Sequence, residues 1–330
     1  MAGNDDKGIV CVTGGTGYLA SWLIKKLLQH GYSVRTTIRS HPDKKKDVSF
    51  LTNLPEASEK LQIFNADLDQ PGSFDAAIEG CIGVFLVAHP IDFEGKEPEQ
   101  VTTRRAINGT LSILKACLDS KTVKRVVYTS STSTVVFNGK GLEEMDESTW
   151  TDVDFMRELN PSGAPYMISK TLTEKAALEF AEEHGLDLVT VLPSFIVGPF
   201  INPHCPDSIY ASLAMIFSDK DRYKLLASTP FVHVDDVASA HIFLLQNPDA
   251  KGRYICSAAE LTIYQMSEYF STRYPEYQIP KADCLKEFEG FHKHSGLSSK
   301  KLLDAGFKYK YGLDEMFDEA IQCCKEKGFL

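Results

Sequence analysis

The sequence predicts an α/β fold in which a doubly wound parallel sheet carries a smaller C-terminal lobe. Short apolar runs alternate with longer amphipathic runs in the first half of the chain, which is the order of a parallel sheet with helices on both faces. The apolar runs also lack in-and-out alternation, as strands buried on both faces do. The rhythm ends near Pro193. We therefore expect a first domain over residues 1–193 and a lobe mainly over 194–330, with some segments of the lobe returning to the first core.

The elements of the first domain follow one another in a regular order. Residues 8–13 (GIVCVT) form an apolar run of strand length, and the helix expected at 18–30 places Leu19, Leu23 and Leu27 on one stripe. The later segments repeat this pairing. Strands are expected at 33–38, 61–64, 82–87, 124–129 and 188–192, and helices at 97–119 and 166–184. Because ligands of such sheets bind at the carboxyl ends of the strands, residues at these ends are the candidates for function.

A glycine-rich turn, TGGTGYLA at 13–20, joins the first strand to the first helix. Gly14 permits a tight turn, Gly17 lets a pyrophosphate approach the backbone, and Ala20 keeps the helix close to the strand. The N-terminus of the helix offers free N–H groups and the positive end of its dipole to phosphates. The place of this motif predicts a Rossmann-type dinucleotide site rather than a structural turn. Its cofactor-binding residues are expected to be Gly14, Gly17, Tyr18 and Leu19.

The residues after the second strand indicate which dinucleotide is bound. NAD sites tend to have an Asp or Glu there for the ribose 2'-hydroxyl, whereas this chain has Arg39 and then a basic run at 44–46. A guanidinium suits a 2'-phosphate. The alternative is a solvated run of surface charge. We expect NADP(H), with Arg39 and Lys46 at the 2'-phosphate and with Asp67 and Leu68 beside the adenine.

A Tyr-x-x-x-Lys sequence lies in the long helix expected at 166–184. Its i,i+4 spacing places Tyr166 and Lys170 on one face of the helix. Tyr277 and Lys281 have the same spacing, but Pro280 lies between them and interrupts a regular helix. A tyrosine ordinarily loses its proton near pH ~10. Because a nearby ammonium and a positive nicotinamide favour the phenolate, we expect the pKa of Tyr166 to be lowered for proton transfer.

Hydroxyl side chains end the fifth strand at 129–132 (TSST). A nicotinamide would lie at this edge of the sheet. Ser131 can donate a hydrogen bond to a substrate carbonyl oxygen and orient it. The alternative is that these hydroxyls only satisfy the end of the strand, and that alternative has more force for Ser130.

Composition and charge argue against several classes of partner. The formal net charge is -10, and an acidic surface repels the phosphates of nucleic acid. The start MAGNDDKG has no hydrophobic signal region, and no apolar run approaches the ~20 residues of a membrane span. We expect a soluble, cytoplasmic monomer or weak homodimer that binds a small-molecule substrate and has no nucleic-acid or membrane partner.

The cysteines and histidines do not indicate a metal site. The eight cysteines are scattered without CxxC spacing, so we expect reduced, buried thiols. His233, Asp235, Asp236 and His241 resemble a metal-binding cluster in composition. However, Asp235 is expected to cap the helix that starts there, and no metal is expected.

Together these segments resemble the extended short-chain dehydrogenase/reductase family. The segments TGGTGYLASWLIKKLL, KTVKRVVYTSS, YMISKTLTEKAALEF and FVHVDDVASAHIFLL are similar to the branch of the plant dihydroflavonol reductases and vestitone reductases, nearest to the latter, with the noscapine synthases also similar. The resemblance runs from about Gly8 to Leu330. It implies an NADP(H)-dependent oxidoreductase acting on CH–OH or carbonyl groups, with Ser131, Tyr166 and Lys170 as the catalytic residues.

The resemblance also implies where the nicotinamide and the substrate lie. The expected cofactor contacts at the nicotinamide end are Val87, Ala88, His89, Tyr166, Lys170, Pro193, Ile196 and Ser208. The expected substrate contacts are His89, Ile91, Ser131, Val136, Tyr166 and Met167.

Two positions depart from the pattern of this branch. Its fourth strand often ends F-H-x-A-[ST]-P, whereas residues 85–90 read FLVAHP, so His89 replaces a small hydroxyl residue and Leu86 replaces the histidine. An asparagine that contacts the flavonoid in dihydroflavonol reductases is Val136 here. Both changes argue against a dihydroflavonol substrate. His89 either packs against Pro90 or hydrogen-bonds a polar group of the substrate.

We therefore expect a reductase of a ketone or aldehyde on a plant specialised metabolite of the flavonoid, isoflavonoid or alkaloid type. Hydride would come from NADPH and the proton from Tyr166. One alternative is an NADP+-dependent dehydrogenase that oxidises an alcohol or hemiacetal, as the similarity to the noscapine synthases implies. Another is a non-catalytic NADP(H)-sensing protein, although a sensor has no need of the Ser, Tyr and Lys set.

Overall fold

The computed structural model describes residues 7–39, 47–90, 97–161, 163–288 and 296–330. A parallel sheet of seven strands forms its centre, in the order β3-β2-β1-β4-β5-β7-β10. This confirms the predicted doubly wound α/β fold, and the strand order reverses between β1 and β4. The strands are β1 (Ile9–Val12), β2 (Ser33–Ile38), β3 (Leu61–Asn65), β4 (Gly83–Leu86), β5 (Arg125–Thr129), β7 (Leu188–Pro193) and β10 (Gly252–Cys256).

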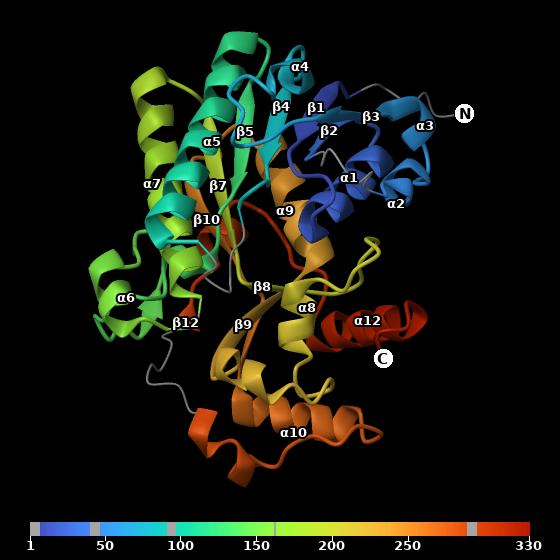
Figure 1. Cartoon of the computed structure of the whole chain (residues 1–330), viewed down its shortest axis with the longest axis vertical. Coiled ribbons are helices and arrows are strands. Elements are labelled where there is room, and N and C mark those ends of the chain that lie inside the picture. Colours follow the sequence, from blue (N-terminus) through green and yellow to red (C-terminus); the bar gives the residue numbers. More distant parts are fainter. Residues whose placement is uncertain (1–6, 40–46, 91–96, 162, 289–295) are drawn as a thin grey trace.

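Helices cover both faces of this sheet (Figure 1). The core on one face contains α1 (Tyr18–Gln29) and α9 (Val234–Gln246), and the core on the other contains α4 (Asp75–Ile78), α5 (Glu99–Ser120) and α7 (Ala164–His184). All residues of β4, β5 and β7 are buried. Burial on both faces explains why these strands show no alternation in the sequence.

The lobe lies at the end of the sheet where β7 passes into β8 (Figure 1). Its three strands follow the order β11-β9-β8, with β8 parallel and β11 antiparallel to β9. Apolar residues of these strands and of three helices, including Phe231, Phe270 and Phe317, form a separate core. The elements of this lobe are β8 (Phe195–Val197), β9 (Ser228–His233), β11 (Ala259–Thr262), α8 (Asp207–Ser212), α10 (Ile263–Arg273) and α12 (Leu313–Glu326).

Short elements complete the chain. They are α2 (Ser49–Thr52), α3 (Ala57–Lys60), α6 (Val153–Leu159), α11 (Lys300–Asp304), the strand pair β6 (Glu144–Met145) and β12 (Gly296–Leu297), and the 3-10 helices η1 (Thr132–Thr134), η2 (Lys220–Leu225), η3 (Ala282–Cys284) and η4 (Lys286–Phe288). The elements expected from the sequence of the first domain are all present, with ends shifted by one or two residues.

The chain does not divide simply at residue 193. β10 comes from the later part of the chain but pairs with β7 in the main sheet, and α9 contributes to the core under that sheet. The division into two domains stays a prediction.

All eight cysteines are free thiols. Cys205 is partly exposed and Cys284 is exposed, so the expectation that all of them are buried was wrong for these two. None of the helices in the described ranges has the length and apolar character that a membrane span requires.

Candidate active site

The glycine-rich turn needs its glycines for conformation and for space. Gly14 has a φ of 73°, in the left-handed region that glycine favours, and a Cβ there would lie 3.1 Å from the Cβ of Ala88. A Cβ on Gly15 would collide with the hydroxyl of Thr36 on β2. The sequence interpretation assigned no role to Gly15, because Thr36, the residue that leaves no room for a side chain there, lies on another strand.

Thr13 joins the two strand ends at which the sheet order reverses. Its hydroxyl accepts hydrogen bonds from the backbone N–H groups of Val87 (3.0 Å) and Ala88 (2.9 Å). These bonds hold the residues after β4 against the glycine-rich turn, which is where a dinucleotide binds in this type of sheet. Val87 and Ala88 thus lie at the predicted place, and Thr13 was missed because its role depends on a partner more than 70 residues away.

The start of α1 suits a pyrophosphate. Gly17 precedes the helix, and no side chain caps the first turn, so its N–H groups are available to phosphate oxygens. Leu19 is buried in the core, so only its backbone can serve a cofactor. The hydroxyl of Tyr18 donates to the carbonyl of Gly198 (3.1 Å), which ties this turn to the lobe. The turn and the helix start therefore fit a dinucleotide.

The residues expected at the adenosine end lie at the ends of β2 and β3. Arg39 is exposed directly after β2, whereas Lys46 lies outside the described residues. The Asp67 carboxylate accepts a hydrogen bond from the Asp69 N–H (3.1 Å). Leu68 packs against Gly109 of α5, where a Cβ would come within 2.8 Å of the leucine side chain. An exposed guanidinium at this strand end fits a 2'-phosphate.

The three predicted catalytic residues meet at the carboxyl end of β5. Tyr166 and Lys170 lie one turn apart on α7, and Ser131 precedes the 3-10 helix that follows β5. The Ser131 hydroxyl is hydrogen-bonded to Tyr166. The Lys170 ammonium donates to the carbonyl of Thr129 (2.8 Å). Ser131 also accepts a bond from the Ser133 N–H (3.2 Å), so it satisfies the strand end as well as facing Tyr166.

Burial shifts the pKa values of Tyr166 and Lys170. Burial raises the pKa of Tyr166 to about 12, although its hydrogen bond with Ser131 lowers it in part. Burial lowers the pKa of Lys170 to about 7, opposed by the negative charge of Glu174. The expected lowering of the Tyr166 pKa is therefore not found in the protein by itself, because the loss of solvent around the phenolate outweighs the neighbouring groups.

A buried ion pair lies one turn further along α7. Glu174 is fully buried and accepts hydrogen bonds from Ser130 (2.7 Å), Thr190 (2.7 Å) and the guanidinium of Arg253 on β10 (3.1 Å). Arg253 also donates to the carbonyls of Glu147 and Thr149, each at 2.8 Å. The Ser130 hydroxyl is thus bonded to a buried carboxylate of α7, whereas the alternative from the sequence was that it satisfies the end of the strand. Glu174 and Arg253 were not predicted, although a charged residue eight positions after Tyr166 falls on the same helix face.

His89 follows β4 and lies against Tyr166. The rings of His89 and Tyr166 meet edge to face, with centroids 5.8 Å apart. Burial and the neighbouring Lys170 lower the pKa of His89 well below its usual value. Both ring nitrogens are buried and have no hydrogen-bond partner among the described residues.

The remaining predicted contacts lie on several elements. Ser208 on α8 donates to the carbonyl of Ile196 on β8 (2.9 Å), so these two lie together, and Pro193 ends β7. Val136 and Met167 are partly buried. Ile91 lies outside the described residues.

The cluster around His233 serves to join helices. The predicted cap at Asp235 was wrong: the ring of His233 caps α9 by accepting from the Asp235 N–H (3.1 Å). The Asp235 carboxylate instead pairs with Lys26 (2.5 Å) and accepts from the indole of Trp22 (3.0 Å) on α1. Within the described ranges, no group of three or more His, Cys, Asp or Glu side chains is placed to hold a metal.

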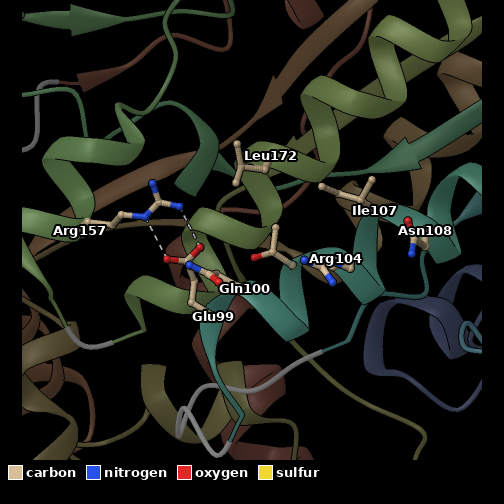
Figure 2. Close-up of a pocket in the computed structure, with 8 residues that line it drawn as sticks. Glu99, Gln100, Arg104, Ile107, Asn108, Arg157 and Leu172 are labelled. Carbon is tan, nitrogen blue, oxygen red and sulfur yellow. Dashed lines mark hydrogen bonds and ion pairs between the residues drawn. The ribbon is translucent and has the colours of Figure 1, made fainter.

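A separate hollow of about 270 Å³ opens between α5, α6 and α7. Figure 2 shows Arg157 of α6 reaching across to Glu99 at the start of α5, with two hydrogen bonds of 3.1 Å. None of the three catalytic candidates lines this hollow. It is therefore not the place where their chemistry would occur.

Comparison with known proteins identifies relatives over the whole chain. The model of the "NAD dependent epimerase/dehydratase family" matches residues 10–256. Vestitone reductase of Medicago sativa is 57% identical over 99% of each chain, and its crystal structure superposes with a TM-score of 0.87 over 98% of this chain and 100% of the other. Noscapine synthase of Papaver somniferum is 50% identical over 98% of this chain and 94% of the other. Dihydroflavonol 4-reductase of Callistephus chinensis is 47% identical over 99% of this chain and 89% of the other.

Proposed function

The chain belongs to the NAD-dependent epimerase/dehydratase family, among the extended short-chain dehydrogenases/reductases, and we propose that it reduces a ketone or aldehyde on a plant specialised metabolite with hydride from NADPH. As a member, it is an oxidoreductase of CH–OH or carbonyl groups that uses a nicotinamide cofactor. The names of its relatives favour a flavonoid, isoflavonoid or alkaloid as the substrate class.

One observation carries the proposal: Ser131, Tyr166 and Lys170 meet beside the strand ends that hold the glycine-rich turn. When bound, the nicotinamide supplies the hydride. The Ser131 hydroxyl donates a hydrogen bond to the carbonyl oxygen of the substrate and polarises it. Tyr166 gives its hydroxyl proton to that oxygen, because a phenol whose pKa is about 12 holds the proton until negative charge develops on the substrate.

Lys170 has two tasks in this scheme. With a pKa of about 7 it is part ammonium and part amine near neutral pH, so it can return a proton towards Tyr166. Its ammonium would also bind the hydroxyls of the nicotinamide ribose. Arg39, exposed directly after β2 where NAD sites tend to have an acidic residue, supports NADPH over NADH.

The similarity to noscapine synthase favours a second candidate, the same chemistry in the oxidative direction. Tyr166 would then accept the proton of an alcohol or hemiacetal while NADP+ is reduced. The residues are shared by both directions. Assays of isoflavanones, dihydroflavonols, aromatic aldehydes and alkaloid hemiacetals, each with NADPH or NADP+, separate the two candidates.

Replacement of Tyr166 by Phe tests the proposal. We expect Tyr166→Phe to lower kcat by roughly 10²–10⁴-fold, the usual contribution of general acid catalysis, with little change in the Kd for NADPH measured by fluorescence. A matched control is Tyr277→Phe, at the other Tyr-x-x-x-Lys sequence in the lobe, which should keep full activity. Activity of Tyr166→Phe within threefold of wild type contradicts the assignment. NADPH binding without turnover of any substrate favours the sensing alternative.

A further inference from the structure

The polar atoms of the His89 ring meet no hydrogen-bond partner among the described residues. It follows β4 directly after Val87 and Ala88, whose N–H groups Thr13 fixes. The backbone at His89 is therefore anchored at the strand end that faces the dinucleotide site. Its ring lies edge to face with Tyr166 at a centroid distance of 5.8 Å.

The polar atoms of this ring are unpaired although they are buried. Neither Nδ1 nor Nε2 has a hydrogen-bond partner among the described residues, and each exposes almost no surface. Buried polar groups in folded proteins nearly always have partners, so each exception needs an explanation, such as a catalytic role or a bound water or ion. Packing against Pro90 leaves both nitrogens unsatisfied and does not account for a histidine at this position.

The state of the ring defines what it can bind. Burial and the positive charge of Lys170 hold its pKa well below the ordinary value, so the imidazole is neutral at physiological pH. A neutral imidazole presents one N–H donor and one acceptor nitrogen. It is thus suited to a hydroxyl or similar group, which both donates and accepts, and not to proton donation as an imidazolium.

We propose that His89 determines substrate specificity by hydrogen-bonding a second polar group of the substrate, close to the carbonyl that Tyr166 protonates. The inference rests on the proposed function. Because His89 touches the ring of Tyr166, a substrate oxygen bonded to His89 belongs to the same part of the molecule as the reacting carbonyl. The substrate is then a carbonyl compound with a hydroxyl near the carbonyl carbon, and an analogue without that hydroxyl is rejected because the imidazole stays unpaired.

The experiment compares matched ketones on matched variants. The probes are acetophenone and its two hydroxylated forms, with the hydroxyl on the carbon beside the carbonyl or on the ring carbon ortho to it. His89→Phe keeps a flat ring against Tyr166 but removes both nitrogens, and His89→Asn keeps a donor and an acceptor. Turnover with NADPH is measured, together with the Kd of each ketone in the presence of NADP+, which does not require chemistry.

We expect wild type to favour one hydroxylated ketone over acetophenone by tenfold or more. His89→Phe should abolish that preference, lowering kcat/KM and affinity at least tenfold more for the hydroxylated ketone than for acetophenone. His89→Asn should restore part of the preference, and the Kd for NADPH should stay the same in all three proteins.

Three results overturn the inference. If wild type has no preference in turnover or in binding, His89 does not contact the hydroxyl. Equal losses for all ketones in His89→Phe assign the residue to packing. A weakened NADPH affinity assigns it to the cofactor site. Failure of the proposed function is seen separately, as binding of the ketones and NADPH without turnover by wild type.

Discussion

At the scale of single residues, the burial of Lys170 has a cost for folding. Lys170 is only 4% exposed, and its pKa in the folded protein is about 7 instead of 10.5. Between these values the unfolded chain binds more protons than the folded chain, so this residue makes stability rise with pH. Its cost is fully present below about pH 7 and disappears towards pH 10.5. Lys170, the lysine to which we assign a catalytic role, therefore destabilises the fold at physiological pH.

Replacement of this lysine by an apolar residue tests that cost. We expect Lys170→Met to be inactive but more stable than wild type near pH 7. The gain in the free energy of unfolding should shrink by up to ~1.4 kcal/mol per pH unit from pH 7.5 to 9.5. Urea unfolding at four pH values measures it. Lys115→Met, on the exposed surface of α5, is the control and should show no such slope. A pH-independent difference for Lys170→Met would sink the idea.

A second residue-scale prediction concerns the choice of cofactor. Arg39 is exposed after β2, where a guanidinium would meet the 2'-phosphate. A charge-assisted contact contributes ~1.5–3 kcal/mol, so Arg39→Ala should raise the KM for NADPH about 10- to 150-fold and leave that for NADH almost unchanged. Arg104→Ala on α5, also exposed, serves as the control. A preference of wild type for NADH is incompatible with this role.

The residues that sequence reasoning found and missed differ in where their partners lie. Tyr166 and Lys170 are neighbours on one helix, so spacing alone relates them. Glu174 depends on Arg253, 79 residues away, and Thr13 depends on the residues after β4. No local pattern specifies such pairs, because they exist only when parallel strands are side by side. The raised pKa of Tyr166 was missed for the same reason, since burial is a property of the whole site.

At the scale of elements, α7 connects the candidate catalytic residues to the strands of the main sheet. One face carries Tyr166, Lys170 and Glu174 at i, i+4 and i+8. Glu174 is bonded to Ser130 directly after β5, to Thr190 of β7 and to Arg253 of β10. The helix is therefore tied to three strands of the main sheet. The apolar strands and their helices could be predicted from periodicity, whereas the return of β10 to the sheet could not, because the order of strands is set by non-local pairing.

Loss of the Glu174 charge should loosen this attachment. Removing one partner of a buried ion pair leaves the other charge uncompensated, which costs about 3–5 kcal/mol. We expect Glu174→Gln to lose that much stability in urea unfolding, and the double variant Glu174→Met with Arg253→Met to recover most of it. Asp119→Asn, in the exposed pair with Lys115, should leave Tm unchanged. If Glu174→Gln is as stable as wild type, the pair does not hold α7.

At the scale of the whole molecule, the dinucleotide turn and the lobe are in direct contact. Tyr18 begins α1 in the first part of the chain, yet its hydroxyl bonds Gly198, which follows β8 in the lobe. Its ring also meets Phe200 edge to face at 6.4 Å. The residue that begins α1, within the glycine-rich segment, thus also holds the lobe through a hydrogen bond and a ring contact.

The hydroxyl of Tyr18 allows this contact to be tested without changing its ring. Tyr18→Phe keeps the packing on Phe200 but leaves the Gly198 carbonyl without its donor, a loss of ~0.5–1.5 kcal/mol. Because the lost bond lies between the lobe and the turn, we expect faster amide hydrogen exchange over residues 195–201, while the amides of β5 keep their protection. Tyr32→Phe removes a bond of similar length (2.9 Å) to Gln246 on α9, away from this contact, and should leave residues 195–201 unchanged. Equal exchange in Tyr18→Phe and wild type would show that packing alone positions the lobe.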